Sequence, residues 1–319
     1  MNQSIAIIGQ SGQLLDKLLG VLEQSNLAQC DLYLLSAVAD DAGASTLYKG
    51  KPLGFQHIDS QDFNHVDLVL FLESQLVFSA YKDKLLALAC PVIVANADQT
   101  APVKELIFSS HQETSSNTYY LATPLSIALK EMFTDFTVEA LDLTLLCSAD
   151  FFTQAGINEL ASQTAKLLNA QPIEQKVFSK QLPFNCFPLA EHDLGKAYQH
   201  QIIQECCFCF ATDEVQLSAV QMPLFHGKTL LASATLSNKI DLDTIQSTLK
   251  NNPSVSLLSS QNLSHLSVES ADTDVVIGNI TCCDFDEYRF NFWLTIDTDA
   301  YLVNSLLMPL VQKMIDKIV

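Results

Sequence analysis

Basic residues are scarce in this sequence. Its 319 residues include 17 lysines and arginines against 36 aspartates and glutamates, a formal net charge of −19 at pH 7. A surface field of this sign repels polyanions, so nucleic acid is not expected as a partner.

Long apolar runs are also missing. The longest, at 66–72 and 302–311, are far shorter than the ~20 residues needed to span a bilayer. A signal peptide has a basic segment before its apolar run, and the short apolar run at 5–8 has none. We therefore expect a cytoplasmic protein without membrane association.

Cysteine usage indicates neither a disulfide framework nor a zinc ribbon, because nine is an odd count for a paired set. The densest group comprises Cys206, Cys207 and Cys209, with His200 upstream. It could in principle bind a metal, but Phe208 and Phe210 beside it indicate core. We expect free thiols in a reducing compartment and no metal site.

Apolar residues are plentiful. Hydrophobic residues make up 48% of the chain and charged residues 17%, which is typical of globular proteins rather than disordered ones. Because a single core rarely grows beyond roughly 250 to 300 residues, the length favours two domains.

The first hundred residues alternate short apolar runs with helical patterns, as in βαβ units. Strands are predicted at 4–8, 31–35, 66–72 and 91–97, with helices at 12–23 and 80–89. Runs that are apolar on both faces belong to a parallel sheet, so the pattern predicts a Rossmann-type doubly wound α/β domain.

The rhythm changes after an apolar tip at 119–122 and a helix at 124–133. A strand at 138–147, a helix at 157–168, and alternating strands at 215–220 and 229–236 predict a half-exposed antiparallel sheet. The tail, 300–319, is predicted as an amphipathic helix that Pro309 kinks. We assign 1–133 with 300–319 to the Rossmann-type domain and 134–299 to a second, α+β domain.

A glycine turn follows the first strand. In a dinucleotide fold, three glycines shape the turn, admit the pyrophosphate and allow close helix packing. Gly9 and Gly12 match the first two, and Leu15 stands at the third. Gly9, Ser11 and Gly12 are thus candidate cofactor-binding residues; a fold relic that binds nothing is the alternative.

The loop after the second strand bears on the choice of cofactor. It carries Asp40 and Asp41 and neither Lys nor Arg, which disfavours the 2′-phosphate of NADP. NAD or a smaller ligand is favoured if any binds. The two aspartates are interpreted as solvated loop charges rather than ribose ligands.

Several blocks together resemble the aspartate-semialdehyde dehydrogenase family, and especially its Usg-like branch. The resemblance covers nearly the whole chain. It is carried by the glycine turn, Ala42-Gly43, and the blocks 159–169, 181–188 (QLPFNCFP), 221–227 and 292–297. It implies a Rossmann-type domain joined to a larger α+β dimerisation domain, with the last helix returning to the first domain, and a homodimer.

The resemblance also implies a chemistry. Family members use a cysteine thiolate that attacks the aldehyde, a histidine that moves protons and an arginine that holds the substrate carboxylate; phosphate then cleaves the thioester. The corresponding positions hold Pro124, Lys228 and Gln221. We therefore expect no catalytic residues of the family type.

Remnants of the family pattern surround these positions. Ser126 is near Pro124 but has no evident activator. If both lay on one strand, His226 would face the same side as Lys228. It could then be a displaced proton carrier, and an ordinary histidine is the alternative. Glu205 matches a substrate-binding glutamate, and Phe208 occupies the place of the cation three positions on.

The cofactor-closing pattern of the family is reduced as well. Asp297 and Thr298 remain, while Leu302 and Val303 replace small residues and are expected to fill cofactor space. We expect no cofactor or weak NAD/NADP binding.

Three functions stay open. The first is a catalytically inactive, homodimeric pseudoenzyme that acts by binding a protein partner or small ligand. The second is an NAD(P)-dependent oxidoreductase of the same family with altered chemistry. The third is a subunit that pairs with an active homologue.

Overall fold

The computed structural model describes residues 3–38, 43–95, 101–112, 114, 116–239, 241–252, 255–270 and 273–318. The chain divides into two compact units, Met1–Ile127 with Asp299–Val319, and Ala128–Thr298. Asp40 and Asp41 lie outside the described residues.

The first unit is built on an eight-stranded sheet in the order β3-β4-β2-β1-β5-β6-β8-β7. All its strand pairs are parallel except β3 with β4. The bounds are β1 (Ser4–Ile8), β2 (Asp31–Ser36), β3 (Ser45–Tyr48), β4 (Lys51–His57), β5 (Leu68–Phe71), β6 (Val92–Val94), β7 (Leu106–Ile107) and β8 (Thr118–Leu121).

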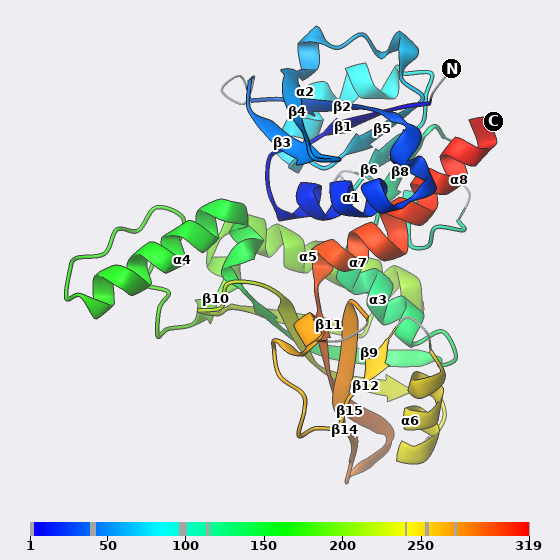
Figure 1. The fold of residues 1–319 in the computed structure, drawn as a ribbon. Coiled ribbons are helices and arrows are strands. Elements are labelled where there is room, and N and C mark those ends of the chain that lie inside the picture. The colour runs from blue at the N-terminus through cyan, green and yellow to red at the C-terminus, as the bar shows by residue number, and fades with distance from the viewer. Residues whose placement is uncertain are drawn as a thin grey trace. The chain divides into compact units, whose positions relative to one another are not determined.

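Helices cover both faces of this sheet (Figure 1). They include α1 (Gln13–Gln24), α2 (Gln75–Leu86) and α8 (Met308–Ile318). Helix α3 (Pro124–Met132) begins in the first unit and ends in the second. The connection through α1 leads from β1 to β2, toward the β3 edge of the sheet. The connection through α2 leads from β5 to β6, toward the opposite edge. Right-handed crossovers therefore place these two helices on opposite faces, which confirms the doubly wound arrangement.

Helix α1 forms because its leucines recur at helical spacing. Leu15, Leu18, Leu19 and Leu22 are all buried, and such a stripe covers one side of a helix. Part of its packing is against the π-helical segment Leu302–Leu307 of the tail.

The tail is less regular than the single helix predicted. α7 (Thr298–Tyr301), the π-helical segment and α8 follow one another, and Pro309 is the second residue of α8. Proline has no N–H and its ring crowds the carbonyl four residues earlier, so the preceding turn widens.

The expected tip at 119–122 is instead strand β8, which pairs with β6 and β7. Its four residues are all buried. The run was too short to show a strand pattern by itself.

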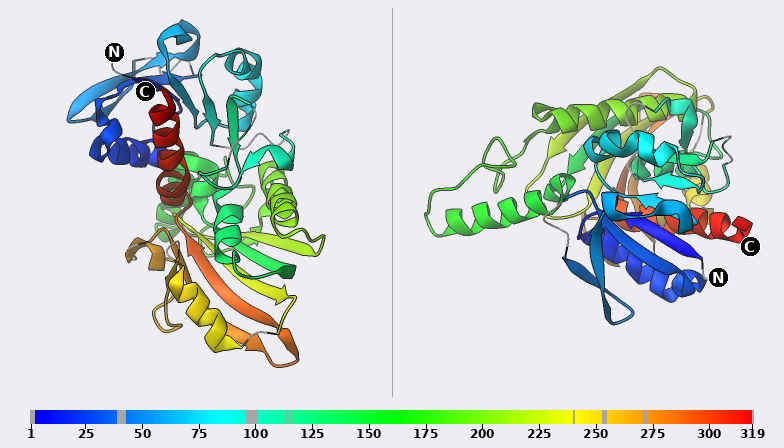
Figure 2. Two further views of the ribbon diagram at one scale, coloured as in Figure 1. Left: turned by 90° about the vertical axis from the view of Figure 1, so that its right-hand side faces the viewer. Right: turned by 90° about the horizontal axis from the view of Figure 1, so that it is seen from above.

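The second unit contains a seven-stranded sheet in the order β10-β11-β9-β12-β15-β14-β13. The strands are β9 (Val138–Cys147), β10 (Phe187–Pro188), β11 (Val215–Gln221), β12 (Lys228–Leu236), β13 (Ser256–Leu257), β14 (Val275–Cys283) and β15 (Asp286–Ile296). The helices are α4 (Thr153–Leu168), α5 (Asp193–Phe210) and α6 (Leu242–Asn251). α6 packs beside β13 and β14 (Figure 2).

The prediction of an antiparallel sheet was wrong for β11, which pairs with β9 in parallel. The chain between these strands includes α4 and α5. A crossover of this length permits parallel pairing, whereas a hairpin would not. β12 is antiparallel to β9, as expected, and also to β15, a strand that the sequence analysis did not predict.

Helix α4 and the returning segment 169–186 extend away from the sheet of their own unit (Figures 1 and 2). We call residues 153–188 the arm. None of the helices among the described residues is both long and apolar enough to cross a membrane.

Candidate functional site

The glycine turn joins β1 to α1 in the predicted strand-turn-helix context. The Gly9 N–H donates to the Leu35 carbonyl at 2.9 Å, and the Gly12 carbonyl accepts from the Asp16 N–H at 3.0 Å. A Cβ at Gly9 would lie 3.4 Å from Leu72 Cβ, and one at Gly12 would meet no described residue within 4 Å. Among the described residues, the turn leaves space next to Gly12.

The side chains around this turn do not suit a dinucleotide diphosphate. Such a group sits at the helix N-terminus between the first and fourth Rossmann strands, here β1 and β5. Asp16 lies in the first turn of α1, and Glu73, 4% exposed, lies one residue beyond Leu72. The turn fits the group in shape but not in charge.

Leu15, Leu302 and Val303 are the bulky residues that the sequence analysis expects to fill cofactor space. Leu15 is 2% exposed, and Leu302 and Val303 are buried as well. These side chains belong to two elements that pack against each other, α1 and the π-helical segment. These side chains therefore pack in the core of the first unit.

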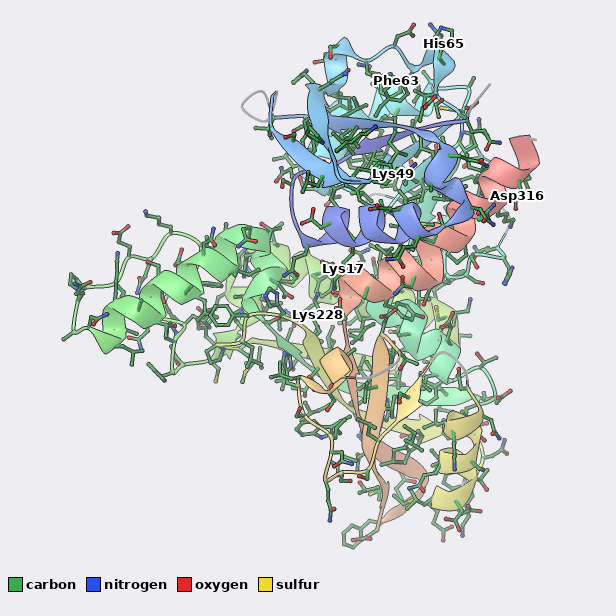
Figure 3. All side chains as sticks on the ribbon, viewed as in Figure 1. Lys17, Lys49, Phe63, His65, Lys228 and Asp316 are labelled. Atoms are coloured by element: carbon green, nitrogen blue, oxygen red, sulfur yellow. The ribbon has the colours of Figure 1, made fainter. Side chains whose placement is uncertain are left out.

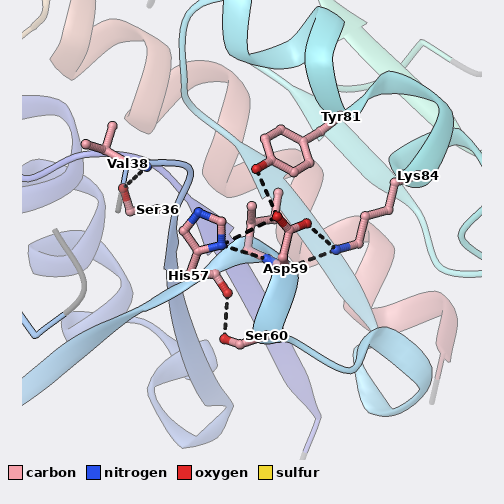
Figure 4. Close-up of polar contacts among 8 residues, drawn as sticks. Ser36, Val38, His57, Asp59, Ser60, Tyr81 and Lys84 are labelled. Atoms are coloured by element: carbon pink, nitrogen blue, oxygen red, sulfur yellow. Dashed lines mark hydrogen bonds and ion pairs between the residues drawn. The ribbon is translucent and has the colours of Figure 1, made fainter. Parts of the chain in front are cut away.

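A polar cluster lies beyond β4 at the carboxyl edge of the same sheet (Figure 4). Asp59 accepts from Lys84 Nζ at 3.3 Å and from the Tyr81 hydroxyl at 3.4 Å. Lys84 also donates to the Ile58 carbonyl at 3.0 Å. Burial, and then Asp59, raise the pKa of Tyr81. The lysine is thus engaged by protein groups rather than presented to a phosphate.

In the second unit, Gln221, Cys147 and Lys228 form one cross-strand row. Cys147 is the register partner of Gln221 on β11 and of Lys228 on β12. Register partners project to the same face of a sheet. Gln221 and Cys147 are fully buried and Lys228 is 8% exposed. The structure therefore brings together two of the sequence-predicted positions, Gln221 and Lys228, around a thiol.

Lys228 begins β12 (Figure 3), and its Nζ donates to Thr298 Oγ1 at 2.9 Å. A lysine amine is a strongly basic point charge, unlike an imidazole that titrates near neutral pH. It is therefore less suited than an imidazole to accept and release a proton near neutral pH.

Gln221 is held by backbone groups. Its Nε2 donates to the carbonyls of Cys147 and Met222, each at 3.2 Å. Its Oε1 is buried and makes no hydrogen bond within the described residues. A neutral amide lacks the charged, two-pronged geometry with which arginine binds a carboxylate.

The chain has no second arginine to replace it. Arg289 is the only arginine in the sequence. Its guanidinium donates to Ser233 Oγ at 2.6 Å and forms an ion pair with Asp142 on the neighbouring strands. The one guanidinium is therefore used inside the second unit's sheet.

The thiol of Cys147 is not activated. Burial raises its pKa to about 12, and the charge of Lys228 opposes this only in part. Burial likewise raises the pKa of Tyr198, on α5, to about 12. Because the thiolate is the nucleophilic form, Cys147 stays inert near neutral pH.

The other thiols with a resolved shift behave in the same way. Burial raises the pKa of Cys30, Cys90 and Cys207, and that of Cys209 to about 12. Among the described residues, no group of three or more potential ligands gathers to hold a metal.

The expectation that Phe208 is core was wrong. Its side chain is 51% exposed, because it lies on the opposite side of α5 from buried Cys206.

Glu205 is fully buried on α5, and its Oε1 accepts from Gln201 Nε2 at 2.9 Å. Three positions on, where the resemblance predicts a cation, Phe208 has a side chain that is 51% exposed. The remnant glutamate thus has a hydrogen-bonding role inside its own helix.

His226 is not on a strand, which corrects the alternation argument. β12 begins at Lys228, and Gly227 between them has φ +87. His226 Nδ1 lies 3.8 Å from Asp150 Oδ2, and its carbonyl lies 2.7 Å from His265 Nε2. His226 therefore shares a turn network with Asp150 rather than a strand face with Lys228.

Asp150 is a polar anchor that the sequence pattern did not indicate. It accepts from Ser148 Oγ at 2.6 Å and from the Gly227 N–H at 3.0 Å. His265 also joins the network, with Nδ1 2.7 Å from Thr229 Oγ1. These residues are far apart in sequence, so only the β9–β12 pairing brings them together.

Pro124 is the first residue of α3. Thr123 Oγ1 donates to Ser126 Oγ at 2.9 Å and accepts from the Ser126 N–H at 3.4 Å. Proline at the first position and a hydroxyl cap before it are both favourable at a helix start. This segment is arranged as a helix start, with Ser126 buried in the cap.

These features define a class: a protein of two α/β units, one with a Rossmann sheet and one with a mixed sheet that carries a buried polar row. Residues 154–298 match the family model described as the semialdehyde dehydrogenase dimerisation domain.

Full-length similarities point the same way. The chain is 24% identical to the USG-1 protein homolog of Pseudomonas aeruginosa, over 96% of this chain and 97% of that protein. It is 24% identical to the aspartate-semialdehyde dehydrogenase of Vibrio mimicus, over 92% and 98%. Its fold matches the structure of a probable aspartate-semialdehyde dehydrogenase from Pseudomonas aeruginosa with a TM-score of 0.87, at 20% identity and full coverage of both chains. The chain is thus similar to aspartate-semialdehyde dehydrogenases and USG-1 homologs over nearly its whole length, and it shares their fold.

Proposed function

We propose that this chain is a catalytically inactive, homodimeric member of the family that acts through binding. The proposal is carried by Pro124, which stands where the resemblance places the family nucleophile and begins a segment arranged as a helix start. Proline has no nucleophilic atom, and loss of a nucleophile alone can slow an enzyme by roughly 10⁴-fold or more.

Three further observations support the proposal independently. Lys228 occupies the proton carrier's position and bonds Thr298. Gln221 occupies the carboxylate anchor's position, and the only arginine is engaged with Asp142. No thiol with a resolved pKa shift has its pKa lowered. One substitution could be compensated, but these affect separate steps of the same reaction.

The homodimer is supported by the match to a dimerisation domain. Its binding partner would be a small ligand, a protein or an active homologue.

One observation favours a second candidate, an oxidoreductase of altered chemistry that still uses NAD or NADP. Gly9 and Gly12 remain, and a Cβ at Gly12 would meet none of the described residues within 4 Å. The acidic residues Asp16 and Glu73 oppose this reading.

The test is an assay of phosphate-dependent oxidation of aspartate semialdehyde with NAD and with NADP, beside an active family enzyme. We expect a rate at least about 10⁴-fold lower than that of the active enzyme. A parallel thermal-shift titration measures cofactor binding, because a ligand that binds the native state raises the melting temperature. Turnover within about 100-fold of the active enzyme would overturn the proposal, while a thermal shift without turnover would favour a cofactor-binding pseudoenzyme.

A further inference from the structure

A cavity of about 360 Å³ lies within the second unit, at the base of the arm. Three phenylalanine rings and a histidine ring contribute to its lining: Phe152, Phe178, Phe187 and His192. Phe152 contacts both Phe178 and His192 edge-on, at centroid distances of 5.5 and 4.8 Å. Such a wall suits an aromatic ring, because aromatic pairs prefer edge-to-face contacts at these distances.

Polar groups complete the cavity's edge. Glu191 lines it and forms an ion pair with Lys180 at 2.6 Å. Lys180 Nζ also lies 5.9 Å from the centre of the Phe187 ring. An apolar floor with a charged rim is the usual anatomy of a protein–protein contact.

Phe184, in the same segment of the arm, is 76% exposed. Its φ is +62, in the left-handed region that residues other than glycine rarely adopt. Hydrogen bonds on both sides hold this conformation: the Asn185 N–H donates to the Leu182 carbonyl at 3.0 Å, and Asn185 Nδ2 donates to the Gln181 carbonyl at 2.9 Å. The chain therefore holds a large apolar ring in solvent by fixed backbone geometry.

Hydrogen bonds to α4 hold the backbone around this turn. Leu182 is fully buried, and its N–H donates to Gln163 Oε1 of α4 at 3.0 Å. Glu159, one turn earlier on α4, accepts from the N–H groups of Lys176, Val177 and Phe178 at 2.5 to 3.2 Å. Phe184 and the cavity are thus fixed to the same helix.

A cavity and a projecting ring on one segment suit a two-fold contact between identical chains. In a two-fold dimer the same patch meets itself, so a knob and a hole on that patch are used twice. The whole set lies within residues 154–298, the part that matches a dimerisation domain, apart from Phe152 two residues before it.

We propose that Phe184 of each protomer inserts into the cavity lined by Phe152, Phe178 and Phe187 of a second copy of this chain. The inference rests on the homodimer of the proposed function and names the surface that forms it. Phe184 is the anchor of the contact, and its backbone strain is the cost of presenting the ring in advance.

The test compares dimer dissociation constants, by sedimentation or mass photometry, for the full chain and two variants. Phe184→Ala removes the ring, and Ser179→Trp fills the cavity from an exposed lining position. We expect each to raise the dissociation constant by about 30-fold or more, as for an interface anchor. Their effects will not add, because filling the cavity has no further cost once the ring is gone.

The matched control is Phe285→Ala, which removes another phenylalanine, 99% exposed at the turn between β14 and β15. It is expected to leave the dissociation constant within about threefold of the unmodified chain. Circular dichroism and melting temperature establish that each variant is folded.

A second measurement does not depend on truncation. A photo-crosslinking benzoylphenylalanine at position 184, in dimers that combine ¹⁴N- and ¹⁵N-labelled chains, should give intermolecular crosslinks to residues 176–192. A dimer whose dissociation constant is unchanged by Phe184→Ala, or crosslinks only within one chain, would overturn the assignment while the homodimer stands. An unmodified chain that stays monomeric at tens of micromolar would contradict the homodimer itself.

Discussion

Lys228 lies beside Cys147 as its register partner across β9 and β12, which places a buried cation next to a buried thiol. A cation lowers a thiol's pKa, and in a catalytic site that effect would create a nucleophile. Here burial outweighs it, and the pKa of Cys147 rises to about 12. Neighbouring charge alone therefore does not make a catalytic cysteine.

This balance predicts an alkaline loss of stability. The native state holds the Cys147 proton up to pH about 12, whereas the unfolded chain releases it near pH 9. Between these values the unfolded state binds fewer protons, so the free energy of unfolding falls as pH rises, by up to about 1.4 kcal/mol per pH unit for each such thiol. Below pH 9 the contribution is present in full.

Urea unfolding at several pH values from 8 to 10.5 measures this slope. Cys147→Ala should make the fall of the unfolding free energy with pH less steep, because one buried thiol no longer contributes to it. The same substitution at the exposed Cys186 should leave the slope unchanged. Equal slopes for Cys147→Ala and the unmodified chain would show that this thiol already ionises in the folded state.

Restoring the nucleophile alone is predicted not to restore catalysis. Pro124→Cys places a thiol in the first turn of α3, where the helix N-terminus favours a thiolate. The variant should be alkylated by iodoacetamide at position 124, as peptide mass mapping will show. Aldehyde oxidation should stay at the level of the unmodified chain, because Gln221 and Lys228 still lack the anchor and the proton carrier.

The control for this variant is Pro124→Ser, which has no thiol at the same site. Aldehyde-dependent NADPH formation by Pro124→Cys, and not by Pro124→Ser, would mean that the rest of the catalytic machinery survives. That outcome would contradict the proposal of independent losses.

The hydrogen bond between Lys228 and Thr298 is predicted to contribute to stability. Thr298→Val removes an acceptor from the Lys228 ammonium, which is 8% exposed, and a hydrogen bond to a charged group contributes about 1.5–3 kcal/mol. Chemical denaturation should show a loss of that size for Thr298→Val and a smaller loss for Thr298→Ser, which keeps the hydroxyl. With Lys228→Met already in place, Thr298→Val should cost little; an undiminished cost would assign the effect to packing.

Much of the fold is predictable because its core elements carry strong local patterns. The wholly apolar run of β1 and the leucine spacing of α1 identify a βαβ start, and β9 has the predicted bounds Val138–Cys147. The direction of β11 was not predictable from its own residues. It depends on the path taken by α4 and α5, which no local period records.

The candidate site divides in the same way. Pro124, Gln221 and Lys228 could be identified because they stand at fixed places in family-like blocks. Asp150 could not, since its contact with Gly227 joins residues 77 positions apart. The strand assigned to His226 failed because the positive φ of Gly227 interrupts the alternation.

The carboxylate of Glu159 is predicted to be essential for the shape of the arm. Glu159→Gln replaces an acceptor oxygen by an amide that donates, which leaves one or more of the three backbone N–H groups without an acceptor. We expect a loss of about 1–3 kcal/mol and faster amide exchange at 176–178. Glu174→Gln is the control: this exposed carboxyl, whose pKa Lys176 and Lys166 lower to about 2, makes only side-chain ion pairs in the same segment.

Two helical glycines are predicted to respond to alanine with opposite signs. A Cβ at Gly195 of α5 would lie 2.2 Å from the Leu189 carbonyl oxygen and 2.7 Å from Leu189 Cγ, so the helix start must move. Gly195→Ala should destabilise the chain by about 1–3 kcal/mol, as overpacking does. Gly20 lies inside α1, and a Cβ there would meet nothing within 4 Å in the part of the chain that the structure describes. Gly20→Ala should stabilise by about 0.5–1 kcal/mol, because alanine restricts the unfolded chain and favours a helix. Urea unfolding of both variants measures the pair; a destabilised Gly20→Ala would indicate that the open space beside α1 is filled by another molecule or by a second copy of the chain.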